Sequence, residues 1–480
     1  MLPNLKLSYY NFFIPHRDRD IYIIYNSLAN SMVQVDWDKG FMLEHLNSME
    51  IHHLDIETIE LLKENRMIIP IETDEFQMIS DYAVRQRDAN DNDEILFLLF
   101  TTTNSCNMGC PYCYQGDKSA KNLDAKYLSP ENIEAIKKFV LKTVTQPHAT
   151  PIKSINIQWY GGEPLMQKGI IEDLSAYILD IVEKYDLGFY AHIITNGYLL
   201  DDKTWELFER CRITDVQVTI DGNEEMHNKM RSLVNGKGTY DLILKNIARM
   251  PAGKFKAIIR VNGDREVFQY LPEMFDDFER YGLWPQRNNE ISFHWAPKFY
   301  NFLGHTQEKS IYYTSYEYQK SKEDFARLRL SKYNKWAAQN GKRIKNLKVG
   351  YPELSKIYCS TVESPNSFSL DSSGFIHKCY NTVNNKEKRI QHISEFTTHD
   401  ERFHHYKKLV KTAFPECKTC KALPICEESC NMRMLDNAEN KICSAWKYFM
   451  KERMIAYYEQ QFAEEQRKLE KEAAIEPATL

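Results

Sequence analysis

Short apolar runs alternate with longer amphipathic segments along most of the chain. The short runs have the length and the β-branched and aromatic content of buried strands, whereas the longer segments repeat their apolar residues at helical spacing. Segments 129–145 and 170–185 are two such helices, the first with Ser129 at its N-cap and Pro130 at the first helical position. Six successive β/α units predict an α/β fold whose parallel sheet curls into a partial (β/α)6 barrel. The strand-like runs lie at residues 94–103, 154–160, 188–195, 215–220, 254–262 and 290–297.

The segments that flank these units have patterns of their own. Residues 22–35 contain two β-like runs around an Asn-rich turn, followed by two short helical stretches and an apolar run. This order predicts a small winged-helix-like domain over residues 1–90, ahead of the barrel over residues 91–300. Residues 301–350 are rich in Tyr, Lys and Ser and predict a bridging region with one helix. The C-terminal residues 447–480 predict a long charged helix.

Composition narrows the class of protein. A chain of 480 residues is longer than one hydrophobic core usually organises, so we expect several domains. Its 43% of hydrophobic residues can bury a sizeable core, which excludes global disorder. Lys and Arg number 62 against 67 Asp and Glu, a net charge of −5 that argues against a nucleic acid as partner.

The lengths of the apolar runs indicate whether the chain could cross a membrane. None approaches the roughly 18 consecutive apolar residues of a spanning helix, so no association with a membrane is expected. The first residues show no basic region followed by an apolar stretch, and we therefore expect a cytoplasmic protein. In that reducing compartment the 11 cysteines are not expected to pair as disulfides, which makes their spacing informative.

Three cysteines follow the first predicted strand. Cys106, Cys110 and Cys113 form a C-x3-C-x2-C pattern within one loop. Thiolates are soft ligands that suit zinc and iron–sulfur clusters, so the loop predicts a metal centre. Cys211 has no cysteine near it in the sequence and is predicted to be an ordinary buried thiol.

Seven further cysteines gather in the C-terminal part of the chain. They include a C-x2-C pair, which occurs in structural zinc sites as well as in iron–sulfur sites, and the spacing alone leaves both open. The seven are Cys359, Cys379, Cys417, Cys420, Cys426, Cys430 and Cys443.

Polar motifs also follow the next predicted strands. Gly161, Gly162 and Glu163 follow the second, Asn196 ends the third, and Thr219 lies near the end of the fourth. In parallel β/α folds, reactive groups lie at the C-terminal ends of strands, so these residues are expected to meet the cysteine loop. Glycines allow a close approach of backbone to ligand, and a carboxylate can hold an ammonium group.

Taken together, these motifs resemble the radical S-adenosylmethionine (radical SAM) superfamily, over residues 94–446, and the C-terminal cysteines resemble its SPASM subgroup. The resemblance implies that Cys106, Cys110 and Cys113 hold three irons of a 4Fe–4S cluster. The fourth iron of that cluster chelates the amino and carboxylate groups of S-adenosylmethionine in this family. Further cofactor contacts are implied for Tyr112 near the adenine, for Gly161, Gly162 and Glu163 at the methionyl amino group, and for Asn196, Thr219 and Arg231.

The SPASM resemblance implies two auxiliary iron–sulfur clusters, of 4Fe–4S type, in a domain over residues 351–446. Only three cysteines match the first cluster, which leaves an open iron, a non-cysteine ligand or a smaller cluster as alternatives. By position, Cys359, Cys379 and Cys430 would hold the first cluster, and Cys417, Cys420, Cys426 and Cys443 the second.

The resemblance implies an enzyme that reductively cleaves S-adenosylmethionine and abstracts hydrogen from a ribosomally made precursor peptide, installing a thioether or carbon-linked crosslink. Sulfatase maturases of the same superfamily carry an aspartate base directly after the cysteine that matches Cys379, whereas this chain has Tyr380. Because a tyrosine with a pKa near 10 is a poor base at neutral pH, a sulfatase maturase is the second candidate. A zinc-stapled binding protein without enzymatic activity is the third. No residue is assigned as the general base.

Partners follow from the same resemblance. The N-terminal domain resembles the leader-peptide recognition elements (RRE) of peptide maturases, in which a leader adds a strand to a sheet edge. A structural cap over the barrel is the alternative interpretation of that domain. The resemblance also implies an electron donor such as flavodoxin or ferredoxin.

Overall fold

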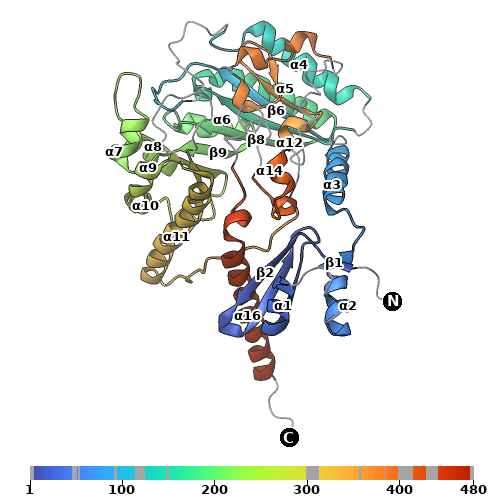
Figure 1. The fold of residues 1–480 in the computed structure, drawn as a ribbon. Helices are drawn as coiled ribbons and strands as arrows, with labels where there is room; N and C mark the ends of the chain where they lie inside the picture. The colour runs from blue at the N-terminus through green and yellow to red at the C-terminus, as the bar shows by residue number, and fades with distance from the viewer. Residues whose placement is uncertain are drawn as a thin grey trace. The chain divides into compact units, whose positions relative to one another are not determined.

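The computed structural model describes residues 5–45, 51, 54–90, 94–113, 125–147, 151–298, 313–355, 359–383, 385–397, 414–428 and 442–475 (Figure 1). Its contacts divide the chain into two compact units. We call residues 87–345 and 359–408 the sheet unit. Residues 1–86, 346–358 and 409–480 form the terminal unit, which thus combines the two ends of the chain.

The sheet unit is built on one eight-stranded sheet. All neighbours from β11 to β12 pair in parallel, and β13 pairs antiparallel with β12. The strands, in the order in which they pair, are β11 Ile291–Pro297, β10 Lys256–Gly263, β9 Ile213–Thr219, β8 Gly188–Thr195, β7 Ser154–Gly161, β6 Ile95–Thr103, β12 Ser367–Leu370 and β13 Ile376–His377.

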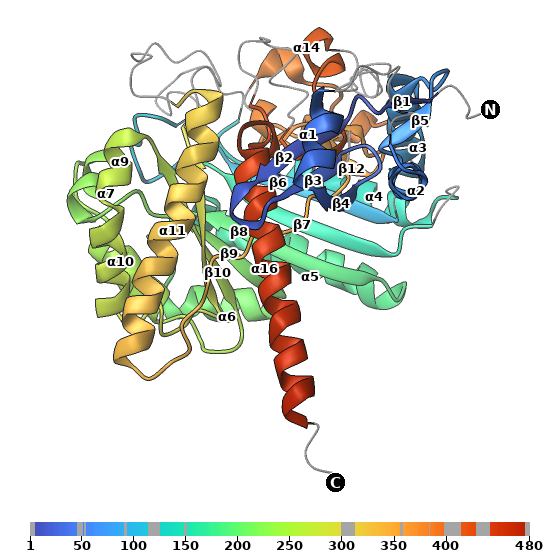
Figure 2. The same ribbon diagram turned by 60° about the horizontal axis from the view of Figure 1, so that its bottom comes forward.

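Helices cover one face of this sheet. The outward residues of β7, namely Ile155, Ile157 and Trp159, belong to the main core together with residues of α4 and α5. Figure 2 shows α5 and α6 beside the strands β7 to β9. The helices of the sheet unit are α4 Pro130–Thr145, α5 Lys168–Lys184, α6 Asp202–Arg210, α7 Glu224–Met230, α8 Tyr240–Ala248, α9 Arg265–Gln269, α10 Leu271–Arg280, α11 Ser315–Gln339 and α12 Ser360–Glu363.

The opposite, inner face of the sheet carries polar side chains as well as a small apolar cluster that includes Leu99 and Tyr160. Because side chains alternate along a strand, the residues between the buried outer positions share this face. Gln158, Gln217 and Arg260 are half-buried there, and His294 is exposed. Solvent therefore reaches polar groups along the inner face in the described structure.

The terminal unit contains an antiparallel sheet of β2 Asn11–His16, β3 Ile21–Asn26 and β4 Ser31–Asp36. Every residue of the central strand β3 is buried, since both of its faces are covered. Tyr22 and Ile24 pack with residues of α1 Trp37–His45 and α2 Ile56–Glu64. The alternate residues, such as Ile23, pack against Trp446 and Met450 of the last helix, α16 Ala445–Ile475.

The remaining elements of the terminal unit are short, except for α3. The strand β1 Leu5–Leu7 pairs antiparallel with β5 Ile68–Pro70. The helix α3 Glu75–Asn90 leads out of this unit towards β6, and α14 Pro415–Lys418 lies in the C-terminal segment.

The parallel α/β fold expected from the sequence is confirmed. All six predicted strands are present as β6 to β11, and Ser129 caps α4 by accepting a hydrogen bond from the Asn132 backbone at 3.2 Å. Two further strands that the sequence did not predict, β12 and β13, extend the sheet beyond β6. The predicted division into five domains stays a prediction, and the contacts group residues 359–408 with the barrel strands and residues 1–86 with the C-terminal segment.

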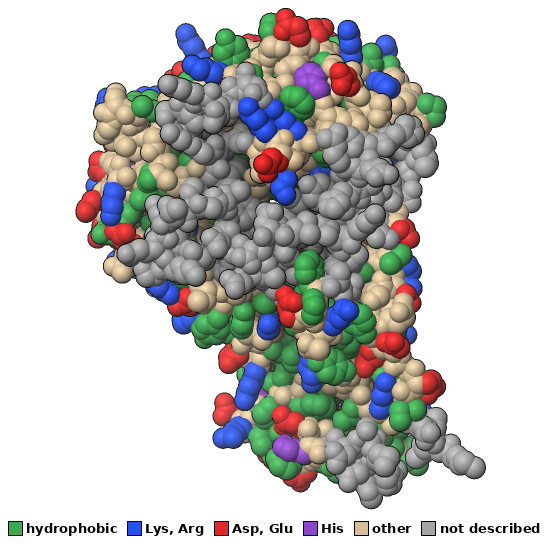
Figure 3. All heavy atoms as spheres, turned by 45° about the horizontal axis from the view of Figure 1, so that its top comes forward, with side chains coloured by type: hydrophobic (Ala, Val, Ile, Leu, Met, Phe, Trp, Pro, Cys, Tyr) green, Lys and Arg blue, Asp and Glu red, His purple; other side chains and the backbone are tan. Residues whose placement is uncertain are grey.

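Acidic and basic side chains are interspersed among the described residues on the face drawn in Figure 3. Neither sign of charge dominates that face, in line with the small net charge of the chain. Among the helices that the structure describes, none is both long and apolar enough to cross a bilayer.

Candidate functional site

The cysteine loop that follows β6 is bound to the segment after α7. Met108 and Leu233 form an isolated antiparallel bridge. Gly109 N donates to Ser232 O at 3.0 Å, and Val234 N donates to Asn107 O at 3.1 Å. These backbone bonds fix the first half of the loop from Cys106 to Cys113 without using any thiol.

The Gly161–Gly162–Glu163 turn lies directly against the same loop. Gly162 N donates to Thr103 O at 2.8 Å, and Glu163 N donates to Ser105 O at 2.9 Å. A Cβ atom at Gly161 would lie 2.4 Å from Thr103 O, and one at Gly162 would lie 2.2 Å from Ser105 O. Only glycine allows this approach, so the sequence motif has a structural cause here.

The Glu163 side chain ties the ends of β7 and β8 together. It is fully buried, and its carboxylate accepts hydrogen bonds from Thr195 Oγ1 at 2.7 Å, Asn196 N at 2.7 Å and Leu165 N at 3.1 Å. Burial raises the pKa of Glu163 above its ordinary value, while these hydrogen bonds oppose the shift. The carboxylate is thereby held in one position beside the cysteine loop.

Asn196 connects β8 to the cysteine loop through its side chain. Its Nδ2 donates to Asn107 Oδ1 at 2.7 Å and approaches Cys106 Sγ at 3.8 Å. Its Oδ1 accepts from Tyr198 N at 3.0 Å, which fixes the orientation of the amide. The predicted strand-end residue therefore does meet the first cysteine of the motif.

Tyr112 anchors the second half of the loop in a buried polar network. Its hydroxyl donates to Asp221 Oδ2 and accepts from Arg231 Nη1 at 2.7 Å. Arg231 also lies 3.8 Å from Asp221 Oδ2. Burial raises the pKa of Asp221, and the Arg231 guanidinium opposes that rise. Asp221 and Arg231, both distant in sequence, thus hold the segment between Cys110 and Cys113 through Tyr112.

A second layer of contacts fixes Asp221 itself. Asn262 N donates to Asp221 Oδ1 at 2.9 Å, and Asp221 N donates to His227 Nδ1 at 3.2 Å. Burial lowers the pKa of His227 well below its ordinary value, so the ring is neutral. Since Nδ1 accepts, Nε2 carries the proton and donates to Thr239 Oγ1 at 3.1 Å. The Lys298 ammonium lies 4.5 Å from the centroid of the Tyr112 ring.

Two buried hydrogen-bond donors beside the loop lack a partner in the described part of the chain, which indicates that the site can bind a polar ligand. Asn107 Nδ2 and Arg231 Nε have no hydrogen-bond partner among the described residues. A ligand with acceptor groups would satisfy them, and the three thiols supply soft ligands for an iron–sulfur cluster. As the side chains lie, no three His, Cys, Asp or Glu residues of the described chain meet at one metal position. The donor set fits a 4Fe–4S cluster with a polar ligand.

Tyr160 lies between two of the predicted cysteine groups. It precedes Gly161 on β7, is buried, and makes an edge-to-face contact with Tyr380 at 6.3 Å between ring centroids. Burial raises the pKa of Tyr160, with smaller contributions from Tyr380, Cys113 and Cys379. Cys379 and Cys113 are therefore both within electrostatic reach of one inner-face residue.

The C-terminal cysteines are divided between the two units. Cys359 and Cys379 belong to the sheet unit, whereas Cys417, Cys420, Cys426 and Cys443 belong to the terminal unit. In the terminal unit, Cys420 N donates to Cys417 O at 3.1 Å, and Lys447 Nζ lies 3.6 Å from Cys443 Sγ. Cys430 lies outside the described residues.

Three residues of this site were not among the cofactor contacts predicted from the sequence. Asp221, His227 and Lys298 all join the network around Tyr112. Asp221 and Lys298 follow the ends of β9 and β11, so the strand-end rule that selected Asn196 also points to them. Thr219, which was selected, ends β9 in register with Arg260 and takes no part in that network.

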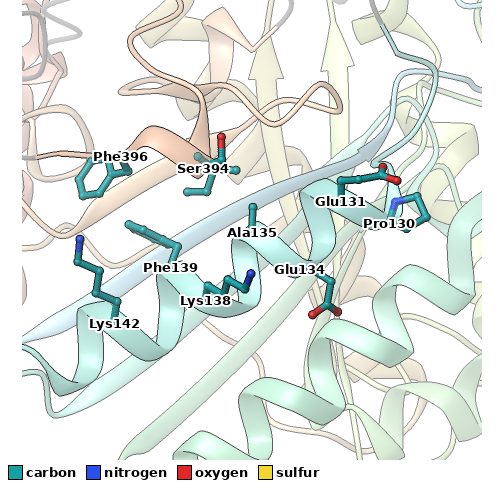
Figure 4. Close-up of a pocket in the computed structure, with 10 residues that line it drawn as sticks. Pro130, Glu131, Glu134, Ala135, Lys138, Phe139, Lys142, Ser394 and Phe396 are labelled. Atoms are coloured by element: carbon teal, nitrogen blue, oxygen red, sulfur yellow. The ribbon is translucent and has the colours of Figure 1, made fainter.

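A surface groove of about 630 Å³ lies away from these residues. Figure 4 shows it between α4 and the segment 393–396, with Glu131, Lys138 and Phe139 on one side and Phe396 on the other. None of the predicted site residues lines it.

Comparison with known proteins identifies the central region. Residues 100–278 match the model of the Radical SAM superfamily. The cysteine-type anaerobic sulfatase-maturating enzyme of Clostridium novyi is 20% identical over 373 residues, which cover 73% of this chain and 93% of that protein. The radical SAM cyclopropyl synthase TigE of Paramaledivibacter caminithermalis is 25% identical over 240 residues, 45% of this chain and 47% of that protein. Several other curated relatives, such as an uncharacterized protein of Methanocaldococcus jannaschii, match over less than half of their length.

Solved structures share the fold. Structures of native anSMEcpe with bound AdoMet, without and with the Cp18Cys peptide, superpose with a TM-score of 0.55 at 18% identity. The match covers 78% of this chain and 100% and 99% of those chains, respectively.

Proposed function

Because residues 100–278 form a radical SAM domain, we propose that this chain reductively cleaves S-adenosylmethionine and uses the resulting radical to modify a peptide. The observation that carries the proposal is the cysteine loop, held by backbone bonds against the Gly161–Gly162–Glu163 turn. When bound, a 4Fe–4S cluster supplies the electron that cleaves S-adenosylmethionine to methionine and a 5′-deoxyadenosyl radical.

The residues of the site have separate roles in this proposal. Cys106, Cys110 and Cys113 would hold the cluster. Gly161 and Gly162 let the backbone approach the cysteine loop, and the fixed Glu163 carboxylate would offer a negative charge to the methionyl ammonium. Arg231, whose Nε has no described partner, would offer that donor to the cofactor carboxylate. Tyr112 orients the loop through Asp221.

We propose a ribosomally made precursor peptide as the substrate and a thioether or carbon-linked crosslink as the product. Half-buried and exposed polar residues of the inner face could hydrogen-bond to a peptide. The anSMEcpe structure with the Cp18Cys peptide supports a peptide on this fold. Residues 1–90 are proposed to bind the leader of that peptide, and flavodoxin or ferredoxin to supply electrons.

We also propose two auxiliary iron–sulfur clusters. Cys359, Cys379 and Cys430 would hold the one nearer the substrate, because Tyr160 lies within electrostatic reach of both Cys379 and Cys113. Cys417, Cys420, Cys426 and Cys443 would hold the other, in the terminal unit. The first has a free coordination position for a substrate thiolate if only three cysteines bind it.

Maturation of a sulfatase is the second candidate function. The match that covers 93% of the sulfatase-maturating enzyme of Clostridium novyi favours it. Tyr380 argues against sulfatase maturation, because the residue directly after Cys379 then has no carboxylate to act as the base. The Tyr380 ring contacts the Tyr160 ring instead.

The test uses the anaerobically reconstituted full chain. With S-adenosylmethionine and dithionite, it should form 5′-deoxyadenosine, and the Cys106→Ala, Cys110→Ala, Cys113→Ala triple variant should form none. A precursor peptide identified by a search of the neighbouring reading frames and labelled with deuterium should transfer deuterium into 5′-deoxyadenosine. A colourless protein that binds zinc but no iron would contradict the proposal, since iron–sulfur clusters absorb visible light.

A further inference from the structure

One arginine on the inner face of the sheet is held in place without an acidic partner. Arg260 lies on β10 between Ile259 and Val261, which are fully buried in the outer core. Alternation along the strand therefore directs the Arg260 side chain to the inner face. Asn262 shares that face, and its Oδ1 accepts from Arg260 Nε at 2.8 Å.

This hydrogen bond orients the guanidinium and leaves its outer nitrogens available. Arg260 forms no ion pair with any residue that the structure describes. The other cations near the strand ends are already engaged, since Arg231 binds Tyr112 and Lys298 lies 3.1 Å from Asp264. A guanidinium carries its donors in a planar fork that matches the two oxygens of a carboxylate.

The strands on both sides of Arg260 add polar groups to the fork. In the parallel register, Arg260 pairs with Thr219 of β9 and with His294 of β11. Residues in register on neighbouring parallel strands point to the same face and lie about 4.8 Å apart. A hydroxyl and an imidazole thus flank the guanidinium.

Hydrogen bonds connect Arg260 to the cysteine loop. Its partner Asn262 donates from its backbone N to Asp221, which accepts from Tyr112. The Arg260 charge acts on the hydroxyl of Tyr160 and opposes the rise in the pKa of that group that burial causes. Tyr160 directly precedes the Gly161 turn, and Cys113 acts on the same hydroxyl. A ligand bound to Arg260 would therefore reach the region where the radical is proposed to form.

We propose that Arg260, with Thr219 and His294, forms a carboxylate-binding subsite that holds an acidic side chain of the peptide substrate. That the carboxylate belongs to a peptide rests on the proposed function, whereas the affinity of the subsite for carboxylates is independent of it. Because S-adenosylmethionine also carries a carboxylate, the experiment compares this cofactor with a peptide-like probe. The subsite would select peptides with Asp or Glu near the residue that is modified.

Phenylglyoxal labelling of the reconstituted full chain tests this subsite. The reagent modifies accessible arginines, and peptide mapping by mass spectrometry measures the rate at Arg260. The probes are N-acetyl-glutamate amide, the uncharged N-acetyl-glutamine amide, and S-adenosylmethionine. Arg249 serves as an internal control, because it is exposed in the same unit and forms no ion pair with a described residue.

The glutamate probe should slow labelling of Arg260 about tenfold at ten times its dissociation constant, as mass action requires, and leave Arg249 unchanged. The glutamine probe and S-adenosylmethionine should leave both rates unchanged. His294→Ala should raise the dissociation constant of the glutamate probe about fivefold, the effect of one lost hydrogen bond. Arg260→Lys, which keeps the charge without the fork, should retain the fold and bind the glutamate probe more weakly in a calorimetric titration, which does not depend on labelling of the arginine.

Equal protection by the glutamine probe, or equal protection of Arg249, would overturn the subsite. Protection by S-adenosylmethionine would assign the carboxylate to the cofactor and overturn the assignment to the peptide. Formation of 5′-deoxyadenosine, measured in the same preparation, reports separately on the proposed function. Active protein without protection refutes only the subsite, whereas protection in an inactive protein refutes only the proposed function.

Discussion

The two groups of cysteines in this chain are held by different forces. The loop of Cys106, Cys110 and Cys113 is only half-buried and is positioned by hydrogen bonds from strand ends and from the segment after α7. In the terminal unit, Cys417 is buried in an apolar cluster with Tyr10, Ile79 and other residues from the opposite end of the chain. Polar contacts thus orient the first group, whereas the second group contributes a buried cysteine, Cys417, to an apolar core.

This difference indicates different roles for a bound metal. In the proposed function, a cluster on the half-buried loop with its fixed backbone would serve chemistry. A cluster in the terminal unit would instead join segments that are some 400 residues apart and add to their folding free energy. The predictions below test whether the cysteine groups separate into catalytic and stabilising sites.

The largest effect is expected from the cysteine loop. The triple variant of Cys106, Cys110 and Cys113 to Ala should lose all cleavage of S-adenosylmethionine and about four irons per chain, because one cubane cluster is lost. Its melting temperature should change little, since hydrogen bonds other than those of the thiols hold the loop. Iron analysis, 5′-deoxyadenosine formation and thermal unfolding measure the three quantities. If the variant still cleaves S-adenosylmethionine, the loop does not hold the catalytic cluster, and the division into catalytic and stabilising cysteine groups is wrong.

The opposite pattern is expected in the terminal unit. Cys417→Ala should lower the free energy of unfolding by about 3 kcal/mol or more, because it removes a metal ligand as well as buried volume. Cys211→Ala is the matched control, since Cys211 is equally buried in the main core and is not a predicted ligand. The Cys211→Ala control should lower the free energy of unfolding by only about 1 kcal/mol, the effect of the cavity that it leaves. Equal losses in the two variants, measured by urea unfolding, would show that Cys417 holds no metal.

A smaller effect is expected from the network behind the loop. Tyr112→Phe removes the hydroxyl between Asp221 and Arg231 and leaves both buried partners with one hydrogen bond fewer, at a cost of about 1–3 kcal/mol. The loop should then release its iron faster to a chelator, while the terminal unit keeps its own. Tyr198→Phe is the control, because the structure gives its hydroxyl no role at the loop. Unchanged iron release in Tyr112→Phe would remove Tyr112 from the positioning of the loop.

Local patterns predicted most of the sheet unit. The buried alternation of Ile155, Ile157 and Trp159 marks β7 in the sequence, and the observed capping by Ser129 begins α4 as expected. The strands β12 and β13 were missed because they are four and two residues long. Pairing with β6, such as Ser367 with Phe97, stabilises β12, and a local pattern does not contain that contact.

The site was predictable where the fold alone positions a residue. Asn196 meets the cysteine loop because strand ends of a parallel sheet converge. The network of Tyr112, Asp221 and Arg231 joins residues more than 100 positions apart, and the contacts within it depend on loop conformations that the sequence does not specify. The buried strand β3 similarly signals two covered faces, but its pattern does not identify Trp446 as a neighbour.

The smallest effect is expected from an ion pair in the terminal unit, whose contribution to the free energy of unfolding depends on pH. The Glu459 carboxylate of α16 accepts from Arg19 Nη2 at 2.7 Å and lies 2.7 Å from His16 Nε2, and the hydrogen bond from Arg19 lowers the pKa of Glu459 to about 2. Because the folded state has the lower pKa, this stabilisation is present above the unfolded value of about 4.3 and is lost as the pH falls from there towards 2. The Glu459 side chain is 40% exposed, so solvent screening limits the contribution to below about 1 kcal/mol. Urea unfolding of the metal-free protein should show that Glu459→Gln destabilises the protein more at pH 6 than at pH 3, where part of the stabilisation has been lost. Glu464→Gln, an exposed position on the same helix, should match the wild type at both. If Glu459→Gln and the wild type unfold alike at pH 6, the ion pair does not contribute to joining α16 to His16 and Arg19.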